Sequence, residues 1–439
     1  MTYNEATEYL YNQRPSFERQ GATGYKEGLR NTIILDTHLE RPHRHYMTIH
    51  VAGTNGKGSC SHTLAAFLQI CGYKVGLYTS PHLVDFSERI RVNGIPISQD
   101  YVVEFVEREK EFIDSLNASF FEVTTAMAFK YFEEQKVDIA VIEVGLGGRL
   151  DCTNIISPIL SVITNIGLDH TQFLGDTLAK VAGEKAGIIK SKTPVVIGEY
   201  TEDTRKVFEQ KAKNENAPII FAADDNMIES YKIGKDGFIE YNIRNMGMVK
   251  GVLSGIYQAK NTNTILHAII QLGKLGVVSM GSDERSREVV NGEIRKAMMH
   301  VNSLTGLRGR WEVIKEHPYV VCDTGHNAHG WTYLSKQIAT TPCDKRHIVF
   351  SMLEDKDVNA VMKMLPKNAI YYLSQVECQR AMSIEKLAAL ADEYHLLHKE
   401  YNSIWEAYTE AIKAASHNDM VFVGGSSYVV AEFLTKLAQ

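Results

Sequence analysis

The segment at positions 53–59 reads Gly-Thr-Asn-Gly-Lys-Gly-Ser and has the residue types of a phosphate-binding loop. Its glycines let the backbone wrap closely around an anion, and N–H groups at the start of a following helix then face the phosphates. Lys57 can reach phosphate oxygens, and the Ser59 hydroxyl can take a magnesium position. The common pattern GxxxxGK[ST] is not met literally, because Lys57 precedes the last glycine. A plain strand-to-helix turn is the alternative, although it requires less glycine than this segment holds.

Two further polar residues follow apolar runs that we interpret as buried strands. Glu143 comes directly after residues 139–142, and His170 follows the run at residues 160–164 after a short loop. Ligands of open α/β sheets bind beyond the carboxyl ends of the strands, and a carboxylate beside a phosphate loop is a suitable Mg²⁺ ligand. Glu143 and His170 therefore predict a metal site. Two alternatives stay open, because Glu143 can pair with Arg149 and His170 can be an ordinary hydrogen-bonding residue.

Lys185 is notable for the helix face on which it falls. Helical spacing places it on one face with apolar neighbours, namely Leu178, Val181, Ala182 and Ile188. Burial disfavours the charged ammonium group, and a neutral amine can react with CO₂ to give a carbamate, an anion that can approach Mg²⁺. A lysine that extends to water or a buried ion pair would account for the same spacing.

The elements that must position these residues alternate between strands and helices. Strands are expected at residues 47–51, 75–78, 139–144, 160–164 and 195–198. Helices are expected after the glycine segment and at residues 99–116, 122–134, 178–189 and 203–214. This order predicts a parallel sheet with helices on both faces. The alternating stretch at residues 231–241, with turn residues at 234–237, predicts a small antiparallel addition.

A second α/β series follows a charge-rich segment at residues 281–296, which we interpret as a solvated helix or a linker near a domain boundary. Its strands are expected at residues 319–322, 348–351, 370–373 and 421–424, with a helix near 331–338. The predicted fold class is α/β: a P-loop-containing parallel-sheet ATPase domain with a small antiparallel addition, plus a smaller C-terminal Rossmann-like domain. We place these domains at residues 1–303 and 304–439.

The composition argues against several classes of protein. The 439-residue chain has a formal net charge of −6, whereas binding along a nucleic-acid backbone needs a basic excess. No apolar run approaches the roughly 20 residues of a membrane helix, and the start lacks the pattern of a signal peptide. The six cysteines form no CxxC pair. They predict reduced thiols in a cytoplasmic protein rather than a disulfide frame or a zinc site.

Together these segments resemble the Mur ligase superfamily and, within it, the folylpolyglutamate synthase/dihydrofolate synthase family. The matching segments occur in the family's order and cover nearly the whole chain, at residues 51–59, 79–83, 88–94, 143–151, 165–170, 184–188, 323–327 and 425–427. The resemblance implies an ATP-dependent ligase that joins L-glutamate to dihydropteroate, to a reduced folate or to both. It also implies a monomer with no nucleic-acid or membrane partner.

The resemblance further implies roles for individual residues. ATP is expected at Asn55, Gly56, Lys57, Gly58, Asn261, Arg310, Asp323 and His326. Two Mg²⁺ sites are expected at Ser59, Ser80, Glu143, His170 and a carbamylated Lys185. The pterin is expected at Gly28, Leu29, Arg30, Asn31, Phe121, Glu122, Val123, Thr124, Leu150, Asp151 and Cys152. The expected catalytic residues are Lys57, Lys185 and His170.

Some positions depart from the family's pattern. Thr324, Gly325 and Ala328 stand where glycine, alanine and proline are common, and Cys152 replaces an alanine beside the pterin. These changes put the fine substrate preference in question more than the reaction.

In the expected mechanism the substrate carboxylate attacks the γ-phosphate of ATP, and the amine of glutamate then displaces phosphate from the acyl phosphate. Such chemistry depends mostly on positioning and charge neutralisation, which Lys57 and two Mg²⁺ ions would supply. Nucleotide contacts from the second domain, at Arg310 and Asp323, predict a cleft between the domains that closes on binding.

Two other functions are compatible with parts of the sequence. A ligase of peptidoglycan precursors would share the chemistry, but residues 79–83 and 147–151 favour folate, and no separate N-terminal domain for a uridine nucleotide is evident. A nucleotide-binding switch would keep the glycine segment but would need neither a buried Lys185 nor Arg310. Phosphate release that requires both pterin and glutamate would distinguish the ligase from the switch.

Overall fold

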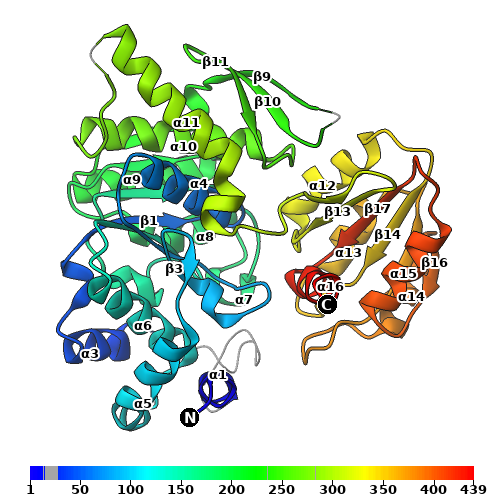
Figure 1. Cartoon of the computed structure of the whole chain (residues 1–439), viewed down its shortest axis with the longest axis horizontal. Helices are drawn as coiled ribbons and strands as arrows, with labels where there is room; N and C mark the ends of the chain where they lie inside the picture. The colour runs from blue at the N-terminus through cyan, green and yellow to red at the C-terminus, as the bar shows by residue number, and fades with distance from the viewer. Residues whose placement is uncertain (13, 15–27, 235, 282) are drawn as a thin grey trace. The chain divides into compact units, whose positions relative to one another are not determined.

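The computed structural model describes residues 1–12, 14, 28–234, 236–281 and 283–439 of the chain. The chain divides into two compact units, and Figure 1 labels many of their helices and strands. Unit 1 comprises Met1–Lys232, Glu240–Val252 and Gln258–Leu307, and unit 2 comprises Ile233–Ile239, Leu253–Tyr257 and Arg308–Gln439. The predicted glycine segment therefore lies in unit 1, whereas Arg310 and Asp323 lie in unit 2.

Unit 1 is built on an eight-stranded sheet with the order β4-β3-β2-β5-β1-β6-β7-β8. Its strands are β1 (Met47–Ala52), β2 (Val75–Tyr78), β3 (Ile90–Val92), β4 (Ile95–Pro96), β5 (Ile139–Glu143), β6 (Leu160–Ile163), β7 (Val195–Ile197) and β8 (Ile219–Phe221). The pairs from β2 to β8 are parallel, and β3 and β4 add an antiparallel edge. The central strands are buried along their length because helices cover a parallel sheet. The carboxyl ends of β2, β5, β1 and β6 consequently lie side by side.

The helices of unit 1 occur mostly between these strands. They are α1 (Tyr3–Asn12), α3 (Arg30–His38), α4 (Lys57–Ile70), α5 (Gln99–Leu116), α6 (Phe120–Glu134), α7 (Thr171–Leu174), α8 (Leu178–Lys185), α9 (Glu202–Glu215), α10 (Gln258–Lys274) and α11 (Glu284–Thr305). Short 3₁₀ turns are η2 (Pro42–Arg44), η3 (Phe86–Arg89), η4 (Cys152–Ile155), η5 (Ala186–Ile188) and η6 (Ala222–Asp224). Ser98, Ser119 and Thr177 cap α5, α6 and α8 by accepting a backbone N–H bond, which stabilises a helix start by about 1 kcal/mol.

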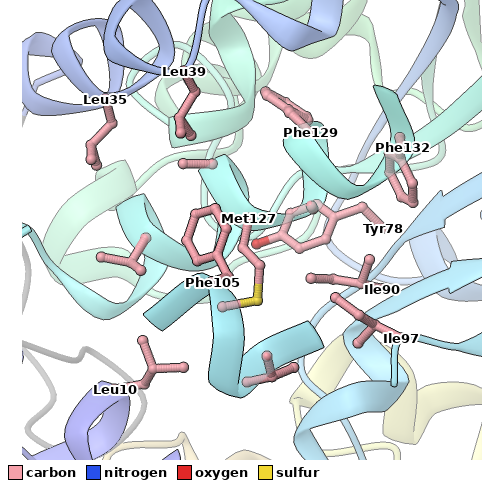
Figure 2. Packing of buried hydrophobic residues seen from close by; sticks show 14 of the residues in the cluster. Leu10, Leu35, Leu39, Tyr78, Ile90, Ile97, Phe105, Met127, Phe129 and Phe132 are labelled. Carbon is pink, nitrogen blue, oxygen red and sulfur yellow. The ribbon is translucent and has the colours of Figure 1, made fainter. Parts of the chain in front are cut away.

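Hydrophobic clusters among the described residues hold several of these helices to the sheet. Figure 2 shows the first, in which Phe105 of α5 and Met127 of α6 pack around Tyr78 at the end of β2. The second joins α8 and α9 to β6 and β7, through fully buried residues such as Val181 and Phe208. Burying each large apolar side chain contributes about 1.5–3 kcal/mol, so α8 is fixed firmly enough to position the residue at its end.

A three-stranded sheet with the order β11-β10-β9 accompanies the main sheet. Its strands are β9 (Ile228–Ile233), β10 (Ile239–Ile243) and β11 (Gly247–Gly251). Consecutive strands joined by such short connections must run antiparallel, and the predicted antiparallel addition is therefore confirmed. Lys235 of the predicted turn lies outside the described residues.

Unit 2 contains a six-stranded sheet with the order β12-β13-β17-β14-β15-β16. Its strands are β12 (Glu312–Lys315), β13 (Tyr319–Asp323), β14 (Arg346–Phe350), β15 (Ile370–Leu373), β16 (Leu397–Glu400) and β17 (Met420–Gly424). Its helices are α12 (Ala328–Thr340), α13 (Val358–Met364), α14 (Ile384–Glu393), α15 (Ile404–Ala414) and α16 (Ser427–Leu437). All strand pairs are parallel except β12 with β13, as the Rossmann-like prediction requires.

The predicted elements needed several corrections. The helix expected at residues 178–189 ends at Lys185 and tightens into η5, where Gly187 passes so close to Arg149 that a Cβ would lie 2.3 Å from its Cα. Helix α10 was not predicted, because its first turns are rich in polar residues of low helix propensity. The charge-rich segment at 281–296 is largely helix α11, with Ser282 outside the described residues. In the described part of the chain, no helix is long and apolar enough to cross a membrane.

Candidate active site

Residues 53–59, the glycine loop, connect β1 to α4. Gly53 and Gly56 have φ angles of +149° and +82°, values that favour glycine. A Cβ added to Gly53 would lie 1.8 Å from Thr164 Oγ1, and one added to Gly56 would lie 2.3 Å from Asn261 Oδ1. Both positions are therefore closed to any side chain. The structure also places Asn261, expected to contact the nucleotide, directly against the loop.

The start of α4 has the features of an anion site. The N–H of Cys60 makes the first helical bond, to Gly56 O, and the N–H groups of the first helical residues have no partner within the helix. Lys57 folds back over the loop, and its Nζ donates to Gly53 O at 3.1 Å and to Thr54 O at 3.3 Å. A cationic side chain and a helix N-terminus thus meet at one place, which favours a bound anion.

Helix α10 supports the loop from a second direction. The Ser59 hydroxyl accepts a bond of 3.0 Å from Gln258 Nε2, and Asn261 Nδ2 donates to Gln258 Oε1 at 2.8 Å. All three residues are buried. Gln258 was missed by sequence reasoning, because nothing local to residue 258 indicates that its partner lies 199 positions away.

The predicted metal ligands lie at the same edge of the sheet. Glu143 is the buried last residue of β5 and is level with Val51 of β1. Ser80 follows β2 by two residues, and His170 precedes α7 with a φ of +50° and a partly exposed side chain. Among the described residues, no three His, Cys, Asp or Glu side chains could hold a metal ion on their own. The oxygen donors of Ser59 and Ser80 suit Mg²⁺, which also uses water and phosphate oxygens.

Lys185 is buried, with 4% of its surface exposed, at the end of α8. Its Nζ donates to Gly53 O at 3.0 Å, and in the described part of the chain it forms no ion pair. Burial, aided by the positive charge of Lys57, lowers the pKa of Lys185 from 10.5 to about 7, against the opposing influence of Asp169 and Asp151. The two alternatives, a solvent-reaching lysine and a buried ion pair, are therefore wrong. A neutral amine able to react with CO₂ fits the surroundings.

The residues expected to bind a pterin at the start of α6 differ in their exposure. Glu122 accepts from Ser119 N at 2.6 Å in a capping box, and Val123 and Thr124 are fully buried. Phe121 is partly exposed, and a Cβ on Gly145 would lie 2.2 Å from its ring. Phe121 is thus the one of these four with a side chain that can meet a ligand, and the other three shape the helix start.

Asp151 organises the loop that follows β5. Its carboxylate accepts from the N–H of Leu146 at 2.8 Å and from the N–H of Thr153 at 3.0 Å. Burial nevertheless raises the pKa of Asp151. Leu150 and Cys152 beside it are partly exposed, and burial raises the pKa of the Cys152 thiol well above its usual value.

The looser match near the N-terminus lies at the start of α3. Leu29 is the residue before the helix, Arg30 is exposed, and Asn31 Nδ2 donates to Leu116 O at 3.4 Å. Gly28 has a φ of +106°, and no atom of the described residues would lie within 4 Å of a Cβ added to it. The structure gives these four residues exposed surface but no feature that marks a ligand.

Unit 2 brings Arg310, Asp323 and His326 together. The Asp323 carboxylate accepts three hydrogen bonds, from Tyr257 Oη at 2.5 Å, Trp311 N at 2.7 Å and Gly325 N at 2.8 Å. Burial nonetheless raises the pKa of Asp323.

Thr324, one of the departures from the family's pattern, sits beside this carboxylate. Its hydroxyl accepts a bond from Arg310 Nη1 and donates to Gly309 O at 3.2 Å, and its carbonyl lies 3.1 Å from His326 Nδ1. Thr324 thus positions Arg310 rather than merely occupying a glycine position.

Two family models match the chain. The Mur ligase middle domain matches residues 51–263, and the Mur ligase glutamate ligase domain matches residues 309–427. The dihydrofolate synthase/folylpolyglutamate synthase of Bacillus subtilis is 33% identical over 428 residues, covering 94% of this chain and 96% of the relative. The corresponding Escherichia coli protein is 31% identical, covering 88% and 87%.

This chain belongs to the dihydrofolate synthase/folylpolyglutamate synthase family. Solved structures agree: E. coli FolC in complex with DHPP and ADP has a TM-score of 0.81 at 28% identity, covering all of this chain and 98% of that one. The Mycobacterium tuberculosis folylpolyglutamate synthase complexed with ADP and AMPPCP has a TM-score of 0.84 at 27% identity, covering 100% and 99%. Members of this family are ATP-dependent glutamate ligases of folate metabolism. The peptidoglycan and switch alternatives are therefore wrong.

Proposed function

We propose that this chain joins L-glutamate to both dihydropteroate and reduced folates, using ATP, as a monomer in the cytoplasm. The observation that carries the proposal is the arrangement at Gly53, whose carbonyl accepts from both Lys57 and the buried Lys185. A phosphate cradle explains Lys57 but not a buried second lysine. Together with a strand-end carboxylate, Glu143, the second lysine is the feature that fits a metal-assisted ligation site.

We propose that the phosphates of ATP lie at Asn55, Gly56, Lys57 and Gly58. Two solved relatives were obtained with AMPPNP and Mn ion, one of them also with L-glutamate. Ser59, Ser80, Glu143 and His170 offer donors that divalent magnesium accepts, and bound magnesium would neutralise charge that develops on the transferring phosphoryl group. Asn261 would position the loop against the nucleotide.

Lys185 is proposed to act as its carbamate. A pKa near 7 leaves a large share of the amine neutral and nucleophilic at physiological pH. The carbamate would turn a side chain that repels cations into an anionic oxygen ligand. Mass spectrometry after trapping with isotopically labelled bicarbonate would show one added CO₂ on the peptide containing Lys185. An unmodified amine in active, CO₂-equilibrated enzyme would contradict this assignment.

The protein's own part in the reaction is chiefly positioning. The Lys57 ammonium would leave the carbonyls of Gly53 and Thr54 and hold the γ-phosphate while the substrate carboxylate attacks phosphorus and ADP departs. The amine of glutamate would then attack the acyl carbon, and phosphate would leave as the amide forms. His170 would remain at the edge of the sheet where Mg²⁺ is proposed to bind. In unit 2, Arg310, Asp323 and His326 would bind the nucleotide, which predicts loss of activity when the units are expressed apart.

The pterin is proposed to meet Phe121, Leu150 and Cys152, which have exposed surface, with Asp151 as the polar partner. The remaining expected pterin contacts stay predictions. They are Gly28, Leu29, Arg30, Asn31, Glu122, Val123 and Thr124. Cys152→Ala would then change the KM for the pterin substrate with little change in the KM for ATP.

The decisive experiment measures ATP-dependent incorporation of labelled glutamate with dihydropteroate and with tetrahydrofolate in parallel. Product with both acids supports the proposal. Product with one acid alone would narrow the activity to that acid, and failure with both in folded protein would overturn the assignment.

A further inference from the structure

The glycine loop is bonded along its first half to the segment that carries His170. Thr54 N donates to Asn165 O at 3.0 Å, and Asn55 N donates to Asn165 Oδ1 at 2.9 Å. The amides of Thr54 and Asn55 are therefore already used inside the protein. Asn165 thereby removes two backbone amides of the loop from those that a phosphate could use, although the Asn55 side chain is not bonded to Asn165 by these contacts.

The Thr54 side chain adds a second set of bonds. Its hydroxyl accepts from Gly167 N at 2.9 Å and donates to Gly167 O at 3.1 Å. The Thr164 hydroxyl also donates to Asn55 O at 2.5 Å. Residues 164–167 thus form hydrogen bonds with both Thr54 and Asn55 of the glycine loop. These bonds add to the ladder between β1 and β6.

We infer that Thr54 and Asn165 are positioning residues that make the glycine loop and residues 164–170 move as one body. The inference rests on the proposed function, because it assigns these residues to the same nucleotide site. A ligand held by the amides of Gly56 to Ser59 would then stabilise the backbone around His170 as well, three residues beyond Gly167. Without the Thr54 hydroxyl, Gly167 loses both of its hydrogen bonds to that side chain, and the link between the two segments is weakened at the end nearer His170.

Hydrogen–deuterium exchange gives a readout that does not depend on turnover. In the wild-type protein, ADP with Mg²⁺ should slow exchange in residues 53–59 and in residues 164–170. In Thr54→Val, which keeps the shape of the side chain, exchange of the Gly167 amide in the free protein should rise about five-fold, as expected for loss of the one ordinary hydrogen bond that this N–H donates. Added ADP with Mg²⁺ should then slow exchange in residues 53–59 as in the wild type, but should slow exchange in residues 164–170 less than in the wild type.

Matched variants separate this role from general destabilisation. Thr193→Val removes a hydroxyl that donates to Pro158 O at 3.2 Å, before the amino-terminal ends of β6 and β7, and should leave both segments as in the wild type. Thr54→Ser should restore the coupled response. Asn165→Ala, which deletes the acceptor of the Asn55 N–H, should weaken ADP affinity about ten-fold and provides a second test if Thr54→Val does not fold.

Kinetics complete the test. Thr54→Val should raise the KM for ATP about ten-fold while leaving the KM for glutamate unchanged. If ADP with Mg²⁺ protects both segments of Thr54→Val as in the wild type, the inference is wrong. An inactive wild-type protein that still shows coupled protection would instead overturn the proposed function and leave the coupling in place.

Discussion

The two clusters of expected nucleotide contacts are built on opposite principles. In unit 1, the amino groups of Lys57 and Lys185 converge on one carbonyl, that of Gly53. In unit 2, the anion Asp323 accepts three hydrogen bonds from its own surroundings. Burial opposes the charge of both Lys185 and Asp323. The Asp323 carboxylate has three hydrogen-bond donors that offset this cost, whereas the Lys185 amine donates to a single carbonyl.

This difference indicates how each cluster would respond to a ligand. Lys57 is held by carbonyl contacts that an incoming phosphate can replace, because a bond between two charged groups is stronger than one to a neutral carbonyl. Asp323 already has its partners and would add little by rearranging. We therefore expect unit 1 to supply most of the binding and catalytic energy, and unit 2 to supply a preformed surface.

The largest expected effect comes from removing the Lys57 ammonium group. Lys57→Met should lower the kcat for glutamate incorporation by about 10³-fold, the upper range for loss of one preorganised group that stabilises developing charge. Lys180→Met, at an exposed lysine that pairs with Asp176, should leave kcat unchanged. If Lys57→Met lowers kcat by ten-fold or less, the cluster in unit 1 does not contribute more to catalysis than the cluster in unit 2.

The next effect tests the close approach that shapes the same cluster. Gly53→Ala should reduce the free energy of unfolding by about 2–4 kcal/mol, because its Cβ overlaps the Thr164 hydroxyl and its backbone is strained. Gly72 also has a positive φ, of +92°, but a Cβ there would meet open space. Gly72→Ala should therefore reduce the free energy of unfolding by only about 1 kcal/mol, for the backbone strain. Urea unfolding of both variants measures the difference, and equal losses would show that the Thr164 contact is unimportant.

A smaller effect follows from the pKa of Lys185. The folded pKa of about 7 lies below the ordinary 10.5, so between these values the unfolded chain holds a proton that the folded protein has lost. Stability contributed by this residue therefore rises with pH across that window, by up to about 1.4 kcal/mol per pH unit. Below pH 7 the cost of burying the ammonium is fully present. Urea unfolding at several pH values in CO₂-free buffer should show this slope in the wild type and a flatter one in Lys185→Met.

The smallest effects are expected in unit 2. Tyr257→Phe removes one of the three donors to Asp323 and should cost about 1 kcal/mol of stability, with at most a few-fold change in the KM for ATP. Asp323→Asn should raise that KM about ten-fold, because the bonds to a charged group are the stronger ones. Loss of kcat comparable to that in Lys57→Met would give unit 2 a direct part in the chemistry.

The sequence allowed prediction of features that depend on neighbouring residues. The glycine loop, Glu143 at a strand end and the burial of Lys185 all follow from local patterns of period and spacing. Gln258, Thr164 and Tyr257 were missed, because their partners are 66 to 199 residues away or depend on which strands become neighbours. The expected pterin contacts came from family resemblance alone, and local patterns did not distinguish the accessible Phe121 from the buried Val123.

The contact between Gly56 and Asn261 also constrains how this lineage can change. A homologue with any larger residue at position 56 would need a smaller one at position 261, since a Cβ would lie 2.3 Å from Asn261 Oδ1. The two positions are therefore expected to change together or not at all. Among distant homologues, a chain that has lost both residues would mark a descendant that has abandoned the nucleotide site proposed at this loop.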